Sequence, residues 1–207
     1  MIVLIRHIYQ ERINNILSVE TFSYDPSIIG RIRASLFEDN SGFRQQNIRR
    51  FENVLNGRSC KYSDYHEIGQ HIIEIFQQTR DNDKTLFRGE ENSVDKIVKH
   101  AITFISRIWI THPYNDGNTR LAVCLLLLYL KYWNISVNND FFSRYPCLFR
   151  ESLVRACYSD DQIDVDSSFA ELFVDMAMEG CYSRDEVYSA FSEMSVKKVS
   201  LNKSKLK

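Results

Sequence analysis

The feature that most constrains the fold is the apolar run Leu121–Leu130, which reads LAVCLLLLYL. A helix from about Asn118 to Trp133 that carries this run is apolar on nearly every side, so it is stable only when other helices surround it. The run is too short to span a bilayer, which requires about 20 apolar residues. The sequence therefore predicts a buried central helix in a helical domain.

Composition limits the classes of protein that this chain can belong to. Its 207 residues are 44% hydrophobic, which allows one domain with a sizeable core. The formal net charge of -1 gives no reason to expect nucleic acid or a membrane as a partner. Five cysteines without CxxC spacing predict reduced thiols rather than disulfides or a zinc site. The N-terminus lacks signal-peptide features, so we expect a cytoplasmic protein, or a secreted effector without a cleaved signal.

The remaining apolar residues recur mainly at helical spacing. They predict further helices at 2–19, 27–39, 63–79, 93–110, 138–158, 167–180 and 183–194. Residues 40–62 lack this period and predict irregular structure or a short hairpin, while 80–92 and 196–207 predict a polar connection and a solvated basic tail. The expected fold is all-α, a helical bundle around a central apolar helix. We divide it into an N-terminal helical extension (1–27), a core (28–182), and a C-terminal helix with the tail (183–207).

A polar segment, THPYNDGNTR at 111–120, leads directly into the predicted central helix. The first turn of a helix has unpaired N–H groups and partial positive charge, so it favours anions. Gly117 has no Cβ and allows close approach of the backbone, and Asn118 and Thr119 can cap the helix or donate to an oxygen. Arg120 offers a planar fork that suits phosphate. These groups predict a phosphate site.

Two further side chains of the segment suggest chemistry at that site. Asp116 is a hard oxygen ligand of the kind that Mg²⁺ uses beside phosphates. His112 lies four residues earlier, where an imidazole can take a proton from an attacking hydroxyl. An anion site, a metal ligand and a general base together predict group transfer from a nucleotide. The alternative is a helix-initiating turn beside a structural histidine.

The nine residues His112–Arg120 resemble the signature of the Fic family, His-Pro-Phe-x-Asp/Glu-Gly-Asn-Gly-Arg. The similarity in the order of elements extends from about Ile28 to Phe173. Most Fic proteins transfer AMP from ATP to a hydroxyl of a target protein, so the resemblance implies a protein adenylyltransferase that uses ATP and Mg²⁺. It also implies a β-hairpin flap at about Gly42 to Lys61 that docks the target by strand-like pairing.

The resemblance assigns a role to each matching residue. His112 would be the general base, and Asp116 would bind Mg²⁺. The backbone N–H groups of Gly117, Asn118 and Thr119 would form an anion hole, to which the Asn118 amide adds a donor. Arg120 would bind the nucleotide phosphates. Tyr114, at the Phe position of the pattern, would be a buried anchor.

Besides Tyr114 in place of Phe, two further positions depart from what Fic members carry. Thr119 replaces a glycine, and Val123 stands where some members carry a second arginine. The related Doc toxins have Lys at the Thr119 position and transfer a phosphate, and Asn115-Asp116 is also Doc-like. Doc-like protein phosphorylation and a catalytically silent Fic-fold interaction module therefore stay open beside AMP transfer.

Many Fic proteins are inhibited by a helix that bears Ser/Thr-x-x-x-Glu-Gly/Asn, whose Glu pairs with the arginine of the motif. Ser189 and Glu193 have this spacing in the last predicted helix, although Met194 breaks the final position. The resemblance therefore suggests inhibition by Glu193. An antitoxin protein is the alternative source of inhibition.

Overall fold

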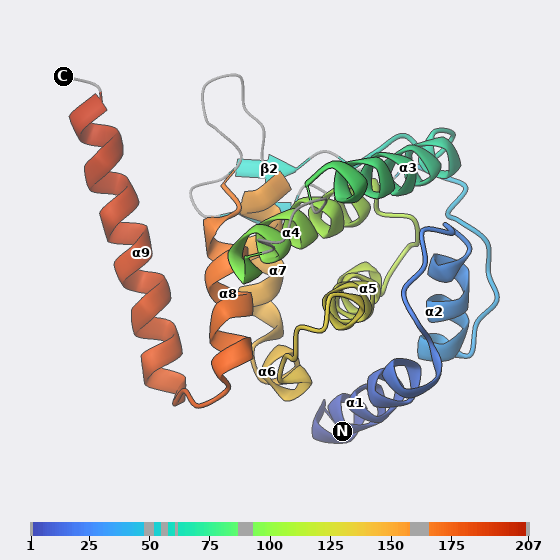
Figure 1. Cartoon of the computed structure of the whole chain (residues 1–207), viewed down its shortest axis with the longest axis horizontal. Helices are drawn as coiled ribbons and strands as arrows, with labels where there is room; N and C mark the ends of the chain where they lie inside the picture. Colours follow the sequence, from blue (N-terminus) through green and yellow to red (C-terminus); the bar gives the residue numbers. More distant parts are fainter. Residues whose placement is uncertain are drawn as a thin grey trace.

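The computed structural model describes residues 2–47, 52–54, 58–60, 62–86, 93–157 and 166–205, with side chains from 8–47, 62–86, 93–157 and 166–195. Helices dominate this part of the chain (Figure 1). They are α1 (Ile2–Val19), α2 (Ile28–Phe37), α3 (Ile68–Leu86), α4 (Val94–Thr111), α5 (Asn118–Tyr132), α6 (Asn139–Arg144), α7 (Pro146–Cys157), α8 (Ser168–Glu179) and α9 (Arg184–Lys205).

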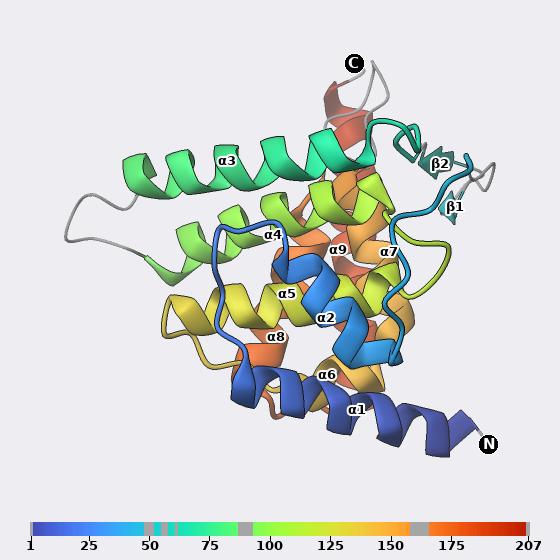
Figure 2. The ribbon, with the colours of Figure 1, turned by 90° about the vertical axis from the view of Figure 1, so that its right-hand side faces the viewer.

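Helix α5 is the centre of the fold, as its sequence predicts. Every residue from Leu121 to Leu130 is buried. The helix packs against α4, α2 and α1, and Figure 1 shows it nearly end-on, with α1 and α2 on one side and α6, α7 and α8 on the other. Figure 2 shows α3, α4 and α5 as successive layers. The all-α prediction is confirmed.

A short hairpin interrupts the helices between α2 and α3. Strand β1 (Glu52–Val54) pairs antiparallel with β2 (Arg58–Cys60), in the register that places Glu52 opposite Cys60. This pairing confirms a small hairpin within the predicted flap, Gly42 to Lys61. Residues 48–51, 55–57 and 61 of that range lie outside the described part of the chain.

Several predicted boundaries were wrong; for example, the helix expected at 63–79 begins at Ile68. The helix expected at 138–158 is divided into α6 and α7 at Tyr145. Pro146 explains the break, because proline has no N–H to continue α6 but suits the first position of α7. The polar connection expected from residue 80 instead continues α3 to Leu86, where buried Asp83 accepts a hydrogen bond from the Tyr129 hydroxyl (2.8 Å). A tertiary contact thus extends a helix whose sequence is polar.

The two ends of the chain differ in how they pack. Helix α1 packs against α2, α5 and α6, whereas α9 packs against α8 and lies at the edge of the molecule (Figure 1). Helix α9 continues to Lys205, so the tail expected to be solvated and mobile from residue 196 is largely helical. The division at residues 27 and 182 stays a prediction.

Two further expectations from the sequence concern membrane-spanning helices and the state of the cysteines. None of the described helices is long and apolar enough to cross a membrane. The cysteines whose side chains are described carry free thiols; they are Cys124, Cys147, Cys157 and Cys181.

Candidate functional site

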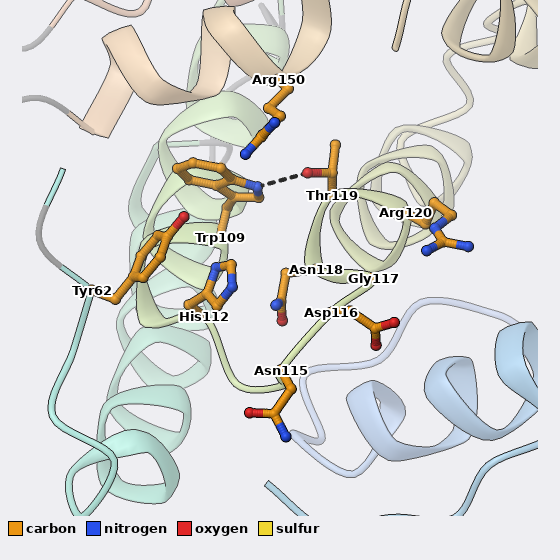
Figure 3. Close-up of a pocket in the computed structure, with 10 residues that line it drawn as sticks. All are labelled: Tyr62, Trp109, His112, Asn115, Asp116, Gly117, Asn118, Thr119, Arg120 and Arg150. Atoms are coloured by element: carbon orange, nitrogen blue, oxygen red, sulfur yellow. Dashed lines mark hydrogen bonds between the residues drawn. The ribbon is translucent and has the colours of Figure 1, made fainter. Parts of the chain in front are cut away.

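A cavity of about 460 Å³ opens at the N-terminus of α5 (Figure 3). The end of α4, the loop 112–117 and the first turn of α5 form most of it, and α7 and the segment before α3 complete it. Its lining comprises Tyr62, Trp109, His112, Asn115, Asp116, Gly117, Asn118, Thr119, Arg120 and Arg150. The fold therefore gathers the predicted base, metal ligand and phosphate-binding residues around one cavity, whereas Tyr114 of the same motif is buried and does not line it.

His112 ends helix α4 in a left-handed backbone conformation, with φ 49°. Its N–H donates to the Trp109 carbonyl oxygen (3.1 Å), and Pro113 prevents the helix from continuing. The imidazole stacks on the Tyr62 ring, with 3.8 Å between centroids and 19° between planes. Trp109 meets the imidazole edge-on at 6.3 Å. Two aromatic side chains thus orient the candidate base.

The loop is held from outside by Arg44, a residue that our sequence reasoning did not identify. The side chain is buried and donates to the carbonyl oxygens of His112 (2.8 Å), Gln46 (2.7 Å) and Ser63. The Arg44 backbone N–H donates to the Pro113 carbonyl oxygen (2.9 Å). Burial lowers the pKa of this guanidinium. Arg44 therefore fixes the backbone that carries His112.

A second arginine from outside the motif, Arg33 of α2, holds the other end of the loop. Its Nη1 donates to the carbonyl oxygen of Asp116 (3.0 Å) and to Asp116 Oδ1 (3.3 Å), and its Nη2 donates to Asp39 (2.9 Å). The guanidinium lies 4.1 Å from the Phe37 ring centroid. The Asp116 side chain remains 73% exposed. Its carboxylate is thus oriented from one side and accessible from the other.

The Asn118 amide closes the loop on itself. Asn118 Oδ1 accepts from the Tyr114 N–H (3.1 Å), and Asn118 Nδ2 donates to the Tyr114 carbonyl oxygen (2.7 Å). These bonds use one of the two N–H groups of Nδ2, so at most the other is left for an anion. Tyr114 is 3% exposed, which agrees with an anchor at this position.

Gly117 occupies a position that requires glycine. Its φ is +76°, and a Cβ there would lie 2.3 Å from Phe37 Cζ and 3.0 Å from Arg33 Nη1. Both the backbone conformation and the contact with α2 exclude a side chain. The tight packing places the start of α5 directly against α2.

The Thr119 side chain turns sideways toward Trp109. Its Oγ1 accepts a hydrogen bond from the indole Nε1 (3.1 Å), as Figure 3 shows. This bond ties the first turn of α5 to the last turn of α4. A threonine at the family's glycine position therefore has a packing role here.

Arg120 and Arg150 are the two arginines that line the cavity. The Arg120 guanidinium lies 4.0 Å from the Tyr9 ring centroid and 4.6 Å from that of Phe37, so it packs against α1 and α2. Arg150, from α7, points toward Trp109 and Thr119 (Figure 3). The two arginines thus approach from different elements.

Ser189 and Glu193 lie elsewhere. Both are exposed on α9, where the Ser189 hydroxyl donates to Glu193 Oε1 (3.2 Å), and neither lines the cavity. Helix α8 lies between α9 and the central helix (Figure 1). The Arg120 guanidinium packs against Tyr9 of α1. Glu193 of α9 does not line the cavity that Arg120 borders.

Sequence reasoning did not identify several residues that shape the site. Three line the cavity, and two hold its loop; they are Tyr62, Trp109, Arg150, Arg33 and Arg44. Trp109 lies three residues before His112, in the last turn of α4. The other four give no local signal, because their contacts with the motif join segments far apart in the sequence. Arg44 lies in the stretch 40–62, which lacks a helical period, so no periodic pattern indicated that its side chain is buried.

Comparisons with known proteins agree with the fold. The model of the Fic/DOC family matches residues 23–130, more than half of the chain. A crystal structure of a Fic domain containing signaling protein from Bacteroides thetaiotaomicron superposes with a TM-score of 0.50 at 16% identity. That match covers 84% of this chain and 66% of the other, so the chain spans under two thirds of that protein. No curated protein matches. The chain belongs to the Fic/DOC family.

Proposed function

We propose that the protein transfers AMP from Mg·ATP to a hydroxyl group of a target protein. The observation that carries this proposal is the position of His112, oriented by Tyr62 at the edge of a cavity that also contains the N-terminus of α5. A base beside an anion site is the arrangement that attack of a hydroxyl on a bound phosphate requires.

In the proposed reaction, His112 accepts the proton of the target hydroxyl as its oxygen attacks the α-phosphorus. A new P–O bond forms to the target, and the bond to the β-phosphate oxygen breaks. Pyrophosphate leaves with that electron pair. The N–H groups of the first turn of α5 and the Arg120 guanidinium stabilise negative charge on the phosphates.

The residues at the site fit a magnesium ion that arrives with the nucleotide. Asp116 has an exposed carboxylate, and only Oδ1 receives the hydrogen bond from Arg33. One carboxylate together with phosphate oxygens is a common way of holding Mg²⁺. The ion would neutralise phosphate charge, and Asp116 would hold it.

Target binding by the flap is part of the same proposal. The β1–β2 hairpin is connected to the site through Arg44, which precedes it, and Tyr62, which follows it. An extended target segment that pairs with this hairpin would bring its hydroxyl toward His112.

The first experiment is intact mass spectrometry of the purified protein after incubation with ATP and Mg²⁺. We expect a mass gain of one AMP group in the wild type. We expect a loss of about 100-fold or more in His112→Asn, because asparagine tolerates the left-handed backbone but is no base. His66→Asn, at an exposed histidine outside the cavity, is the matched control.

A second candidate is transfer of the terminal phosphoryl group. A mainly apolar cavity of about 300 Å³ adjoins the site at Thr119 and Arg120. The amide atoms of Gln10, which lines this cavity, are buried without a hydrogen-bond partner among the described residues. A nucleobase bound there would direct the terminal phosphate toward His112.

The position of a radioactive label separates the candidates. Label at the α-phosphate of ATP marks protein in AMP transfer, and label at the γ-phosphate marks protein in phosphoryl transfer. If neither label is transferred, to the protein itself or to proteins of a lysate, the interaction module is favoured instead.

A further inference from the structure

We propose that Arg150 of α7 binds the terminal phosphates of the nucleotide, in place of the second motif arginine that this chain lacks at Val123. The inference rests on the proposed function, since it names one more residue of the same nucleotide site. It assigns a role to a residue outside the nine-residue motif.

The charges at the cavity suggest the need for such a residue. Among the lining residues, Asp116 carries a negative charge, and Arg120 and Arg150 carry positive charges. A nucleoside triphosphate with one Mg²⁺ still carries about two negative charges. Arg120 packs its guanidinium against Tyr9 and Phe37, on the side of α1 and α2. Arg120 therefore lies on one side of the space proposed for the phosphates, and α5 places no cation on the other side.

Helix α5 supplies no further cation near this point. Val123, three residues beyond Arg120, is 7% exposed and lines the adjoining apolar cavity instead of the polar one. The residues between them, Leu121 and Ala122, are buried in the core. A compensating positive charge therefore has to come from a different element.

Helix α7 brings Arg150 to that position. Phe149 and Leu153 are fully buried and fix α7 against the core, which leaves Arg150 on the face toward the cavity. Figure 3 shows its guanidinium reaching toward Trp109 and Thr119, at the opposite side of the cavity from Asp116. The hydrogen bond between Trp109 and Thr119 holds the first turn of α5 beside it.

The geometry gives the phosphate chain a direction. A chain that begins beside His112 and crosses the N-terminal turn of α5 ends beside Thr119, where Arg150 points. The planar guanidinium can donate two parallel hydrogen bonds to a phosphate. In AMP transfer these bonds also stabilise the charge that develops on the leaving pyrophosphate.

The test compares binding of ATP and AMP, each with Mg²⁺, by titration calorimetry. A non-hydrolysable ATP analogue prevents turnover. We expect Arg150→Gln to weaken binding of the ATP analogue by about 10- to 100-fold, the effect of losing a hydrogen bond to a charged group. AMP binding should change less than threefold. Arg150→Lys, which keeps the charge but not the fork, should lie between.

Arg144→Gln is the matched control, since Arg144 is exposed on neighbouring α6 and does not line the cavity. Melting temperatures of all variants check that they fold. Equal losses for ATP and AMP, or no loss for either, would overturn the role of Arg150. A wild-type protein that binds AMP but not the ATP analogue would do the same. If the wild type binds neither nucleotide, the proposed function itself fails, and the assignment fails with it.

Discussion

The two sides of the α4–α5 loop use the same amino acid in different ways. On the outer side, Arg33 and Arg44 are buried. Arg44 donates to three main-chain carbonyl oxygens, and Arg33 donates to the Asp116 carbonyl oxygen and to two carboxylates. On the inner side, Arg120 and Arg150 border an open cavity. The outer arginines satisfy protein acceptors, whereas the inner ones face the space where we place the nucleotide.

Burial and hydrogen-bond partners decide the role of each arginine. A buried guanidinium with several carbonyl partners fixes geometry, because leaving those acceptors unsatisfied is costly. A guanidinium at the rim of a polar cavity can donate to an anion that enters the cavity. A loop held firmly on one side can present backbone N–H groups on the other without rearrangement.

The largest effect is expected on the outer side, in Arg44→Ala. Loss of three side-chain hydrogen bonds to carbonyl oxygens should lower the free energy of unfolding by about 4 kcal/mol. Urea denaturation measures the change, and Arg80→Ala, on the exposed face of α3, is the control. If Arg44→Ala were as stable as Arg80→Ala, the loop would not depend on this residue.

The second largest effect is expected from Gly117→Ala. Gly117 contacts Phe37 and Arg33 on the outer side of the loop and lines the cavity on the inner side. The left-handed φ and the contact with Phe37 at 2.3 Å should cost about 2 to 4 kcal/mol. Nucleotide binding should weaken as well, since the start of α5 must shift. Gly42→Ala, at a position with open space around it, is the control. Normal binding in Gly117→Ala would contradict a requirement for this backbone.

A smaller effect is expected from Thr119→Val on the inner side. Valine keeps the branched shape but removes the acceptor of the Trp109 indole N–H, which should cost about 1 kcal/mol. Tryptophan fluorescence should report the altered indole environment. Thr103→Val removes an exposed hydroxyl that bonds to Lys99 and serves as the control. An unchanged spectrum would show that the bond does not hold Trp109.

The smallest effect is expected from Glu193→Gln, far from both sides of the loop. Glu193 is exposed on α9 and its nearest described partner is Ser189, so we expect transfer activity to change less than twofold. The same labelling assay measures this. Increased activity would instead support the inhibition that the Ser189–Glu193 spacing suggests, and would require α9 to move toward Arg120.

The sequence predicted those features that local patterns encode. The run Leu121–Leu130 predicted the central helix, and Ser93 predicted the start of α4, where its hydroxyl accepts from the Lys96 N–H (3.3 Å). The motif predicted that His112, Asp116 and Gly117–Arg120 meet at one site. Periodicity did not predict the extension of α3 to Leu86 or of α9 to Lys205, because polar residues at these ends obscure the apolar period.

Sequence alone determined that the chain is helical and that His112, Asp116 and Gly117–Arg120 belong to one nine-residue segment at the start of the central helix. Only the tertiary structure decided what surrounds them. Tyr62, Arg44 and Arg150 reach the motif from segments that are distant in the sequence. Packing around α5 brings these segments together, and no local pattern records which side chains then meet.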